Sequence, residues 1–244
     1  MNAKELYGES KEESFCEIAK WPEYDTKSNP KVLFILKEPS TRNNKGKEYN
    51  FQKELENPAI FKSKSGMWKQ LARCSEMFQR IFKDQSPDLD DLKKSDNKLL
   101  EMLHQSSFTN LKRFGYRKSS SYMRLVGLHA GLFWQLIIGE IKEVKPDIII
   151  CAGTFEIIFE LLNNCLPKIP DYVKKNGYCN IGDIKPFGEV EDNDIWKWRC
   201  KDLVGKEIII VKRNHPARTG PEYFNELKDI AIEIKCDTRY FSKK

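Results

Sequence analysis

Four short apolar runs, separated by long stretches of helical periodicity, constrain the fold of this chain more than any other feature. Three of them are near-continuous and rich in β-branched residues, which is typical of strands buried on both faces. We interpret all four as strands of one sheet. They occupy residues 32–36 (VLFIL), 107–111 (SFTNL), 147–152 (DIIICA) and 207–211 (EIIIV).

Helical patterns fill the intervals between these runs and follow the last of them. They cover residues 65–82, 121–144, 155–162 and 221–234. Each carries apolar side chains at the spacing of one helix face, as Leu125, Leu128 and Leu132 do within the second pattern. Strands that alternate with helices indicate right-handed crossovers and a parallel sheet covered on both sides.

Residues 195–201 (IWKWRCK) break the pattern, because large apolar and basic side chains alternate there. A turn at residues 204–206 and the fourth apolar run follow, which predicts a hairpin that adds an antiparallel strand. We therefore expect an α/β fold in three layers, α/β/α, with a mainly parallel four-stranded central sheet in the order 2-1-3-4 plus this strand. Residues 1–244 are interpreted as one domain with a long helical insertion at about residues 41–105.

Composition excludes several classes of protein. No apolar run approaches the ~20 residues of a membrane span, and the polar amino-terminal residues have no signal-peptide character, so we expect a cytoplasmic protein. The seven cysteines include no C-x-x-C pair, which indicates neither a zinc ribbon nor a disulfide framework. The absence of G-x-G-x-x-G and of G-x-x-x-x-G-K-[ST] argues against dinucleotide and P-loop enzymes.

The distribution of charge suits an anionic partner. The net charge is +6, from 42 basic and 36 acidic residues. Residues 111–124 contain five basic residues and no acid, whereas residues 189–194 are strongly acidic. Such asymmetry is typical of proteins that bind a phosphate backbone, although a solvated basic loop would have the same composition.

Polar residues follow the predicted strands at the edge where parallel α/β sheets bind ligands. Glu38 follows the first strand and could polarise a water molecule as a general base. Asn110 lies at the end of the second, and its amide offers a donor and an acceptor together, as recognition of a base edge requires. His215 follows the fourth, within a basic loop. Each residue taken alone could equally be a turn or surface residue.

The order and spacing of four motifs resemble those of the uracil-DNA glycosylase superfamily. The resemblance spans residues 31–235, with divergent sequence between the motifs. The most specific parts are the K-P…G-T strand and the H-P-A motif. The motifs are Leu36-Lys37-Glu38-Pro39-Ser40, Thr109-Asn110-Leu111-Lys112, residues 145–154 (KPDIIICAGT) and His215-Pro216-Ala217-Arg218.

This resemblance implies a DNA glycosylase that flips a base out of DNA and hydrolyses its N-glycosidic bond without a metal or cofactor. Glu38 corresponds to the residue that activates water, and His215 to the residue that stabilises the charge on the leaving base. Asn110, Ser40 and Trp68 correspond to positions that contact the extruded base, although Trp68 also has the helical spacing of a core residue. The predicted DNA contacts are Lys112, Arg113, Arg117, Lys118, Arg213, Pro216 and Arg218.

Two departures from the family pattern bear on the substrate. Leu36 replaces a glycine and Glu38 replaces a shorter aspartate, so the activated water would sit differently. Ser40 stands where uracil-strict members carry a bulky tyrosine. We hypothesise that the substrate is uracil or, because of this smaller side chain, a larger C5-modified pyrimidine.

Two other functions compete with this interpretation. One is a catalytically inactive nucleic-acid-binding module on the same fold, and the other is an enzyme of another class, such as a nucleotide hydrolase. A glycosylase needs neither nucleotide nor metal, so activity in EDTA separates it from most phosphoryl-transfer enzymes. We expect a monomer whose partner is single- or double-stranded DNA, with repair and defence against foreign DNA both open as roles.

Overall fold

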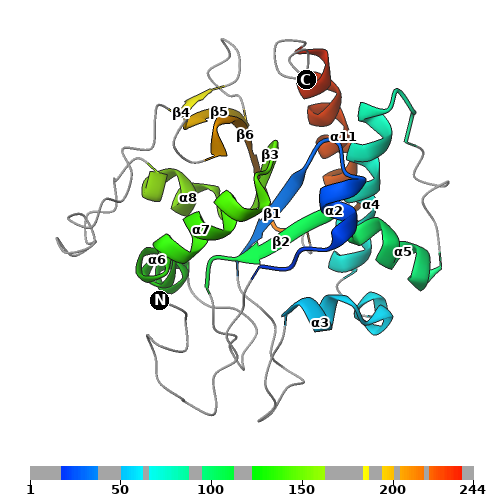
Figure 1. Ribbon diagram of the computed structural model, residues 1–244, viewed down its shortest axis with the longest axis horizontal. Helices are drawn as coiled ribbons and strands as arrows, with labels where there is room; N and C mark the ends of the chain where they lie inside the picture. Colours follow the sequence, from blue (N-terminus) through cyan, green and yellow to red (C-terminus); the bar gives the residue numbers. More distant parts are fainter. Residues whose placement is uncertain are drawn as a thin grey trace.

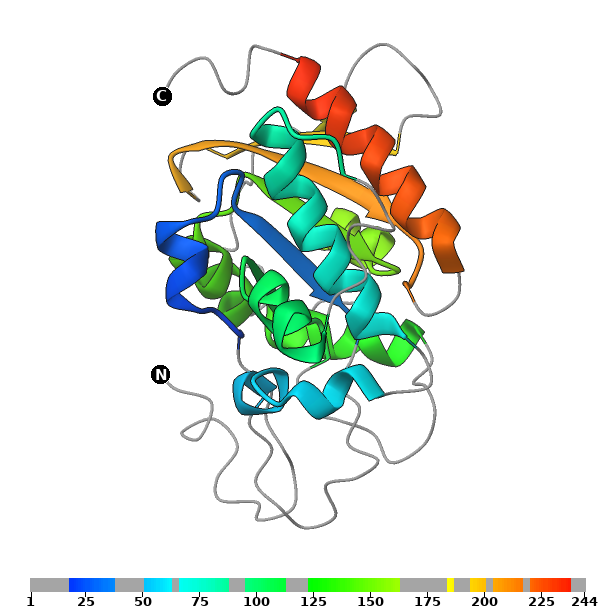
Figure 2. The ribbon, with the colours of Figure 1, turned by 90° about the vertical axis from the view of Figure 1, so that its right-hand side faces the viewer.

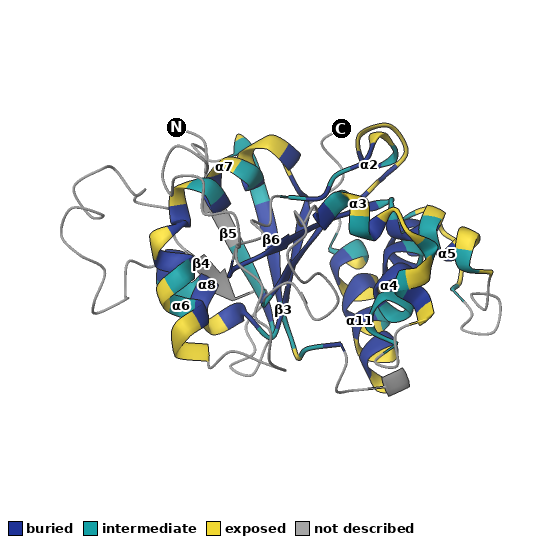
Figure 3. Ribbon diagram, turned by 90° about the horizontal axis from the view of Figure 1, so that it is seen from below, coloured by how far each residue is buried: buried dark blue, intermediate teal, exposed yellow. Residues whose placement is uncertain are grey.

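A mixed sheet of six strands lies between two layers of helices (Figure 1). Figure 3 views the molecule from below and shows β3 and β6 largely buried between the layers, with exposed residues on the outward sides of the helices. Within the described part of the chain, no helix is both long and apolar enough to cross a membrane. The computed structural model describes residues 18–37, 51–62, 66–87, 95–112, 123–162, 184–186, 194–200, 204–216 and 220–237.

The strand order is β2-β1-β3-β6-β5-β4. Strands β2, β1, β3 and β6 are parallel. Since β6 is the fourth predicted strand, this confirms the predicted order 2-1-3-4. Strand β5 pairs antiparallel with β6, which confirms the predicted hairpin. A further strand, β4, pairs antiparallel with β5 and was not predicted, because three residues are too few to show an alternating pattern. The strands are β1 (Val32–Leu36), β2 (Ser106–Asn110), β3 (Ile148–Ala152), β4 (Ile184–Pro186), β5 (Ile195–Cys200) and β6 (Lys206–Arg213).

The register of the parallel strands brings their carboxyl ends into line. Leu36 pairs with Asn110, and Ala152 pairs with Arg213. The pairing of β1 with β2 extends past the strands, since the backbone N–H of Lys112 donates to the carbonyl of Lys37 at 3.0 Å. The residues that follow β1, β2, β3 and β6 therefore begin at one common edge of the sheet.

One face of the sheet is covered by α4 (Met67–Phe82), α5 (Asp96–Leu103) and α11 (Gly220–Cys236), and Figure 2 shows α4 and α11 lying in front of the strands. The buried residues of α4 follow helical spacing, and Phe34 and Phe108 meet them from the sheet. Full burial of one such side chain is worth about 1.5–3 kcal/mol. The described residues of the amino-terminal half also form three shorter elements: α2 (Pro22–Thr26), α3 (Phe51–Leu55) and the 3₁₀ helix η1 (Pro58–Lys62).

The opposite face is covered by α6 (Met123–Leu132), α7 (Trp134–Val144) and α8 (Phe155–Leu162). The prediction of one helix over residues 121–144 was wrong, because the chain leaves helical geometry at Phe133, where ψ is 14°. After this break α7 turns Ile137 and Ile141 into the core, whereas Leu128 and Leu132 of α6 are 57% and 55% exposed. The predicted leucine face of α6 is thus on the outside of the molecule.

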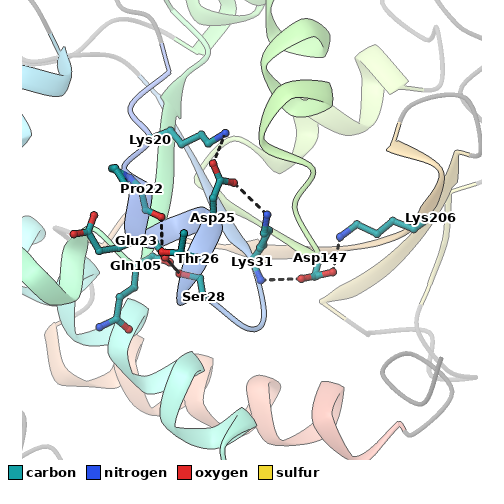
Figure 4. A network of polar contacts seen from close by, with 10 residues as sticks. All are labelled: Lys20, Pro22, Glu23, Asp25, Thr26, Ser28, Lys31, Gln105, Asp147 and Lys206. Atoms are coloured by element: carbon teal, nitrogen blue, oxygen red, sulfur yellow. Dashed lines mark hydrogen bonds and ion pairs between the residues drawn. The ribbon is translucent and has the colours of Figure 1, made fainter. Parts of the chain in front are cut away.

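An ion-pair network ties the amino ends of the strands together (Figure 4). The Asp147 carboxylate accepts hydrogen bonds from the Lys31 backbone N–H at 2.8 Å and from the Lys206 ammonium at 2.5 Å, which joins the starts of β1, β3 and β6. Asp25 of α2 pairs with Lys20 at 2.8 Å and with Lys31 at 3.2 Å. Since these groups bind one another, we assign the network a structural role.

Candidate functional site

Asn110 ends β2 at the carboxyl edge of the sheet, and its side chain is buried, with only 1% of the residue exposed. Phe108, two residues earlier, stacks on Phe34 at 5.2 Å between ring centroids, on the face covered by α4. Because side chains alternate along a strand, Asn110 lies on this same face. An amide is therefore presented inside the protein, next to the end of β1.

Trp68 lies in the first turn of α4 and packs against the same face of the sheet. Its ring contacts Phe108 edge-on at 5.9 Å and Phe51 at 6.2 Å. These contacts place Trp68 half-buried against the hydrophobic core, as the core interpretation of its helical spacing predicted. Its contact with an extruded base stays a prediction.

His215 lies against the turn that follows β3. Gly153 occupies the left-handed region with φ of +72°, and a Cβ placed on it would lie 3.5 Å from the Cβ and the backbone nitrogen of His215. The Gly153 N–H donates to the carbonyl of Arg213 at 2.7 Å, one residue pair beyond the strand ladder. Glycine adopts this left-handed conformation without the strain that a side chain would bring.

A second contact fixes the same turn to β1. Thr154 is fully buried, and its hydroxyl donates to the carbonyl of Ile35 at 2.9 Å. The chain between β3 and α8 is thereby held from both sides, by β1 and by β6.

A hydrogen bond on the other face of the sheet is a contact that the sequence did not reveal. The Thr109 hydroxyl donates to the Glu140 carboxylate at 2.8 Å.

The predicted DNA-contact residues at this edge are more enclosed than that assignment implies. Lys112 is only 3% exposed, and Pro216 is buried. The Arg213 guanidinium pairs with Asp194 at 2.8 Å and with Glu226 at 3.1 Å. A phosphate contact by Lys112 or Arg213 would require the side chain to leave these surroundings.

Of the residues predicted to contact the base, the structure places Asn110 and His215 at the common edge. Asn110 ends β2 and His215 follows β6, which are the outer strands of the parallel group β2-β1-β3-β6. At about 4.8 Å for each of three strand spacings, their backbones lie roughly 14 Å from each other. The predicted site residues Glu38, Ser40, Arg113, Arg117, Lys118 and Arg218 lie outside the described residues.

A hollow of about 500 Å³ lies elsewhere, beside the network of Figure 4. Its lining includes Lys20, Asp25 and Thr26 near α2, Gln52 of α3, and Glu143 at the end of α7. Since α2 precedes β1 and α7 precedes β3, most of this lining lies toward the amino ends of the strands, whereas Gln52 is next to Phe51, which contacts Trp68. Among the described residues, no three His, Cys, Asp or Glu side chains are grouped so as to hold a metal ion.

The fold and the carboxyl edge of its sheet define an α/β protein in which Asn110 and His215 lie at the edge where the parallel strands end. No protein-family model matches the chain, and no curated protein is significantly similar to it. The resemblance to uracil-DNA glycosylases therefore depends on the four motifs, and function has to be argued from the site.

Proposed function

We propose that the protein is a DNA N-glycosylase that hydrolyses the bond between a pyrimidine base and its deoxyribose. The observation that supports this most is that a buried amide, Asn110, and a histidine, His215, lie at the same edge of the sheet. The reaction needs one group that reads a base edge and one donor that stabilises the base as it leaves with negative charge.

The proposed reaction begins when the target base leaves the stack, which costs a few kcal/mol. The Asn110 amide donates to and accepts from the Watson–Crick edge of the base, and His215 donates a hydrogen bond to a base oxygen. Water polarised by Glu38 then attacks C1′ while the C1′–N bond breaks and its electron pair passes to the base. The water proton passes to Glu38, and the base is released after it takes up a proton.

The substrate and partner follow from the motifs. DNA is the proposed partner, and the basic segments would hold the phosphates on either side of the extruded nucleotide. The small side chain of Ser40 motivates the proposal that the base is uracil or a larger C5-modified pyrimidine. A structure of a DNA complex in which another side chain fills the space beside C5 would refute that part.

A strand-release assay in EDTA tests the reaction. Oligonucleotides that contain uracil, thymine mismatches or C5-modified cytosines are incubated with the protein, and abasic sites are then cleaved with alkali. We expect product from at least one of them and a fall in rate of about 10²–10³-fold in His215→Ala and in Asn110→Asp, as for the loss of one stabilising donor. His104→Gln, just before the start of β2 at the opposite edge, and Asn97→Asp, at an exposed position of α5, are the matched controls.

The outcome also decides between the competing functions. No product from any oligonucleotide, together with intact DNA binding, would refute the proposal and favour an inactive nucleic-acid-binding module. Activity that appears only when nucleotide or metal is supplied would favour an enzyme of another class.

A further inference from the structure

Arg213, the last residue of β6, connects three elements through its side chain. Its guanidinium pairs with Asp194 at the start of β5 at 2.8 Å and with Glu226 of α11 at 3.1 Å. Only 13% of its side chain is exposed. The backbone completes the connection, because the Lys212 N–H donates to the carbonyl of Asp194 at 2.8 Å. The end of β6 is therefore fixed to the neighbouring strand and to the helix layer.

The same residue fixes the end of β3 through its main chain. The carbonyl of Arg213 accepts the hydrogen bond from Gly153, and His215 follows two residues later against the same glycine. The position of the His215 backbone relative to β3 thus depends on where Arg213 is held. Rotation of the end of β6 would break the Gly153 contact and move the imidazole with it.

We propose that Arg213 is a positioning residue for His215 and does not contact a DNA phosphate; this inference rests on the proposed glycosylase function. Two carboxylates already balance its single positive charge. A planar guanidinium can bind both at once in fixed directions, which a lysine ammonium does less well. A phosphate would have to displace both carboxylates from a side chain of which only 13% is exposed.

Four substitutions separate the two roles. Arg213→Lys keeps the charge and removes the planar fork, whereas Asp194→Asn and Glu226→Gln each remove one ion pair and keep the arginine. The matched control is Glu156→Gln, which removes a carboxylate from the other side of the same strand end, where Glu156 pairs with Lys212 at 3.2 Å. Circular dichroism verifies that each variant is folded at the assay temperature.

Three quantities are measured for each folded variant. The first is the single-turnover rate of base release, and the second is the slope of log Kd against log salt concentration for DNA binding. The third is the set of ¹H–¹³C NMR resonances of the His215 imidazole, assigned from His215→Ala. The NMR measurement needs neither DNA nor activity, so it reports on positioning even if no base is released.

We expect the first three variants to lower the rate by about 10–100-fold, as a displacement of about 1 Å does. They should also shift the His215 resonances and leave the salt slope unchanged, while Glu156→Gln changes none of the three. Unshifted His215 resonances in these variants would overturn the inference. So would stronger DNA binding by Asp194→Asn and Glu226→Gln, since these changes release a phosphate-binding arginine. Shifted resonances without base release would support the positioning role and refute the glycosylase.

Discussion

Replacement of glycine by alanine should change the stability of the protein in opposite directions at Gly153 and at Gly139. Gly153 lies in a left-handed turn, whereas Gly139 lies inside a helix. Gly153 has φ of +72°, and an L-residue in that region is disfavoured by roughly 1–2 kcal/mol. The added Cβ would meet His215 at 3.5 Å, which is an ordinary van der Waals contact and adds no steric penalty. Gly153→Ala should therefore lower the free energy of unfolding by roughly 1–2 kcal/mol.

Gly139 is the matched control because it lies inside α7, where a Cβ meets nothing within 4 Å. Alanine in a helix interior is favoured over glycine by about 0.5–1 kcal/mol, since the unfolded chain loses conformational freedom. Gly139→Ala should therefore raise the free energy of unfolding by that amount. The two alanine variants should differ by about 1.5–3 kcal/mol.

Thermal unfolding followed by circular dichroism measures this difference. For a chain of this size, 1 kcal/mol moves Tm by about 2–4 °C. We expect Gly153→Ala to melt about 2–8 °C below the wild-type protein and Gly139→Ala to melt above it. Equal or higher stability of Gly153→Ala would refute the left-handed conformation at Gly153.

Two further predictions concern stability. The ring of His104 stacks on Trp21 at 4.3 Å between centroids, and burial lowers the pKa of this histidine. Below the ordinary pKa of about 6.5, the unfolded chain therefore binds a proton that the folded protein does not. The free energy of unfolding should therefore fall as pH drops below about 6.5, and it should fall by less in His104→Gln than in the wild-type protein. Urea unfolding measures this free energy, and an equal fall in both proteins would contradict the prediction. Thr154→Val removes the buried hydrogen bond to Ile35 and should cost about 1–3 kcal/mol, whereas Thr26→Val, at an exposed hydroxyl, should stay within ±0.5 kcal/mol; equal melting temperatures would count against it.

The central sheet could be predicted from the sequence because its strands carry a local signal. Ile148, Ile149 and Ile150 are all buried, and a strand covered on both faces needs apolar side chains on both. The hairpin was equally readable, since alternation in residues 195–201 and the glycine turn at Gly205, with φ of +74°, are both local features. The differences at the strand ends amount to one or two residues.

The helices between β2 and β3 were harder to predict, because local periodicity does not show which face of a helix is buried. A leucine spacing that continues from α6 towards α7 indicates one helix with one core face. The break at Phe133 resets the phase, and only the packing of Trp134 and Ile137 against the sheet shows which face is buried. Periodicity identifies a helix face, but it does not show which side of the molecule that face meets.

The candidate site was predictable in its residues and not in its contacts. Asn110 and His215 could be placed at the carboxyl edge, because strand order and chain direction follow from the alternation of elements. The partners of Arg213 could not be found, since Asp194 and Glu226 are 19 and 13 residues away and no sequence pattern connects them. A basic residue after a strand suggested a phosphate contact, whereas the fold supplies two carboxylates.

The two edges of the sheet differ in how their charges are balanced, and this difference bears on where a ligand binds. At the amino edge the Asp147 carboxylate binds a backbone N–H and an ammonium directly, so a ligand there would have to displace bonds that join three strands. At the carboxyl edge the ion pairs of Arg213 fix the end of β6 and leave the chain to continue to His215, which is half-buried. A ligand at the carboxyl edge could leave these ion pairs in place, which supports the proposal that the site lies there.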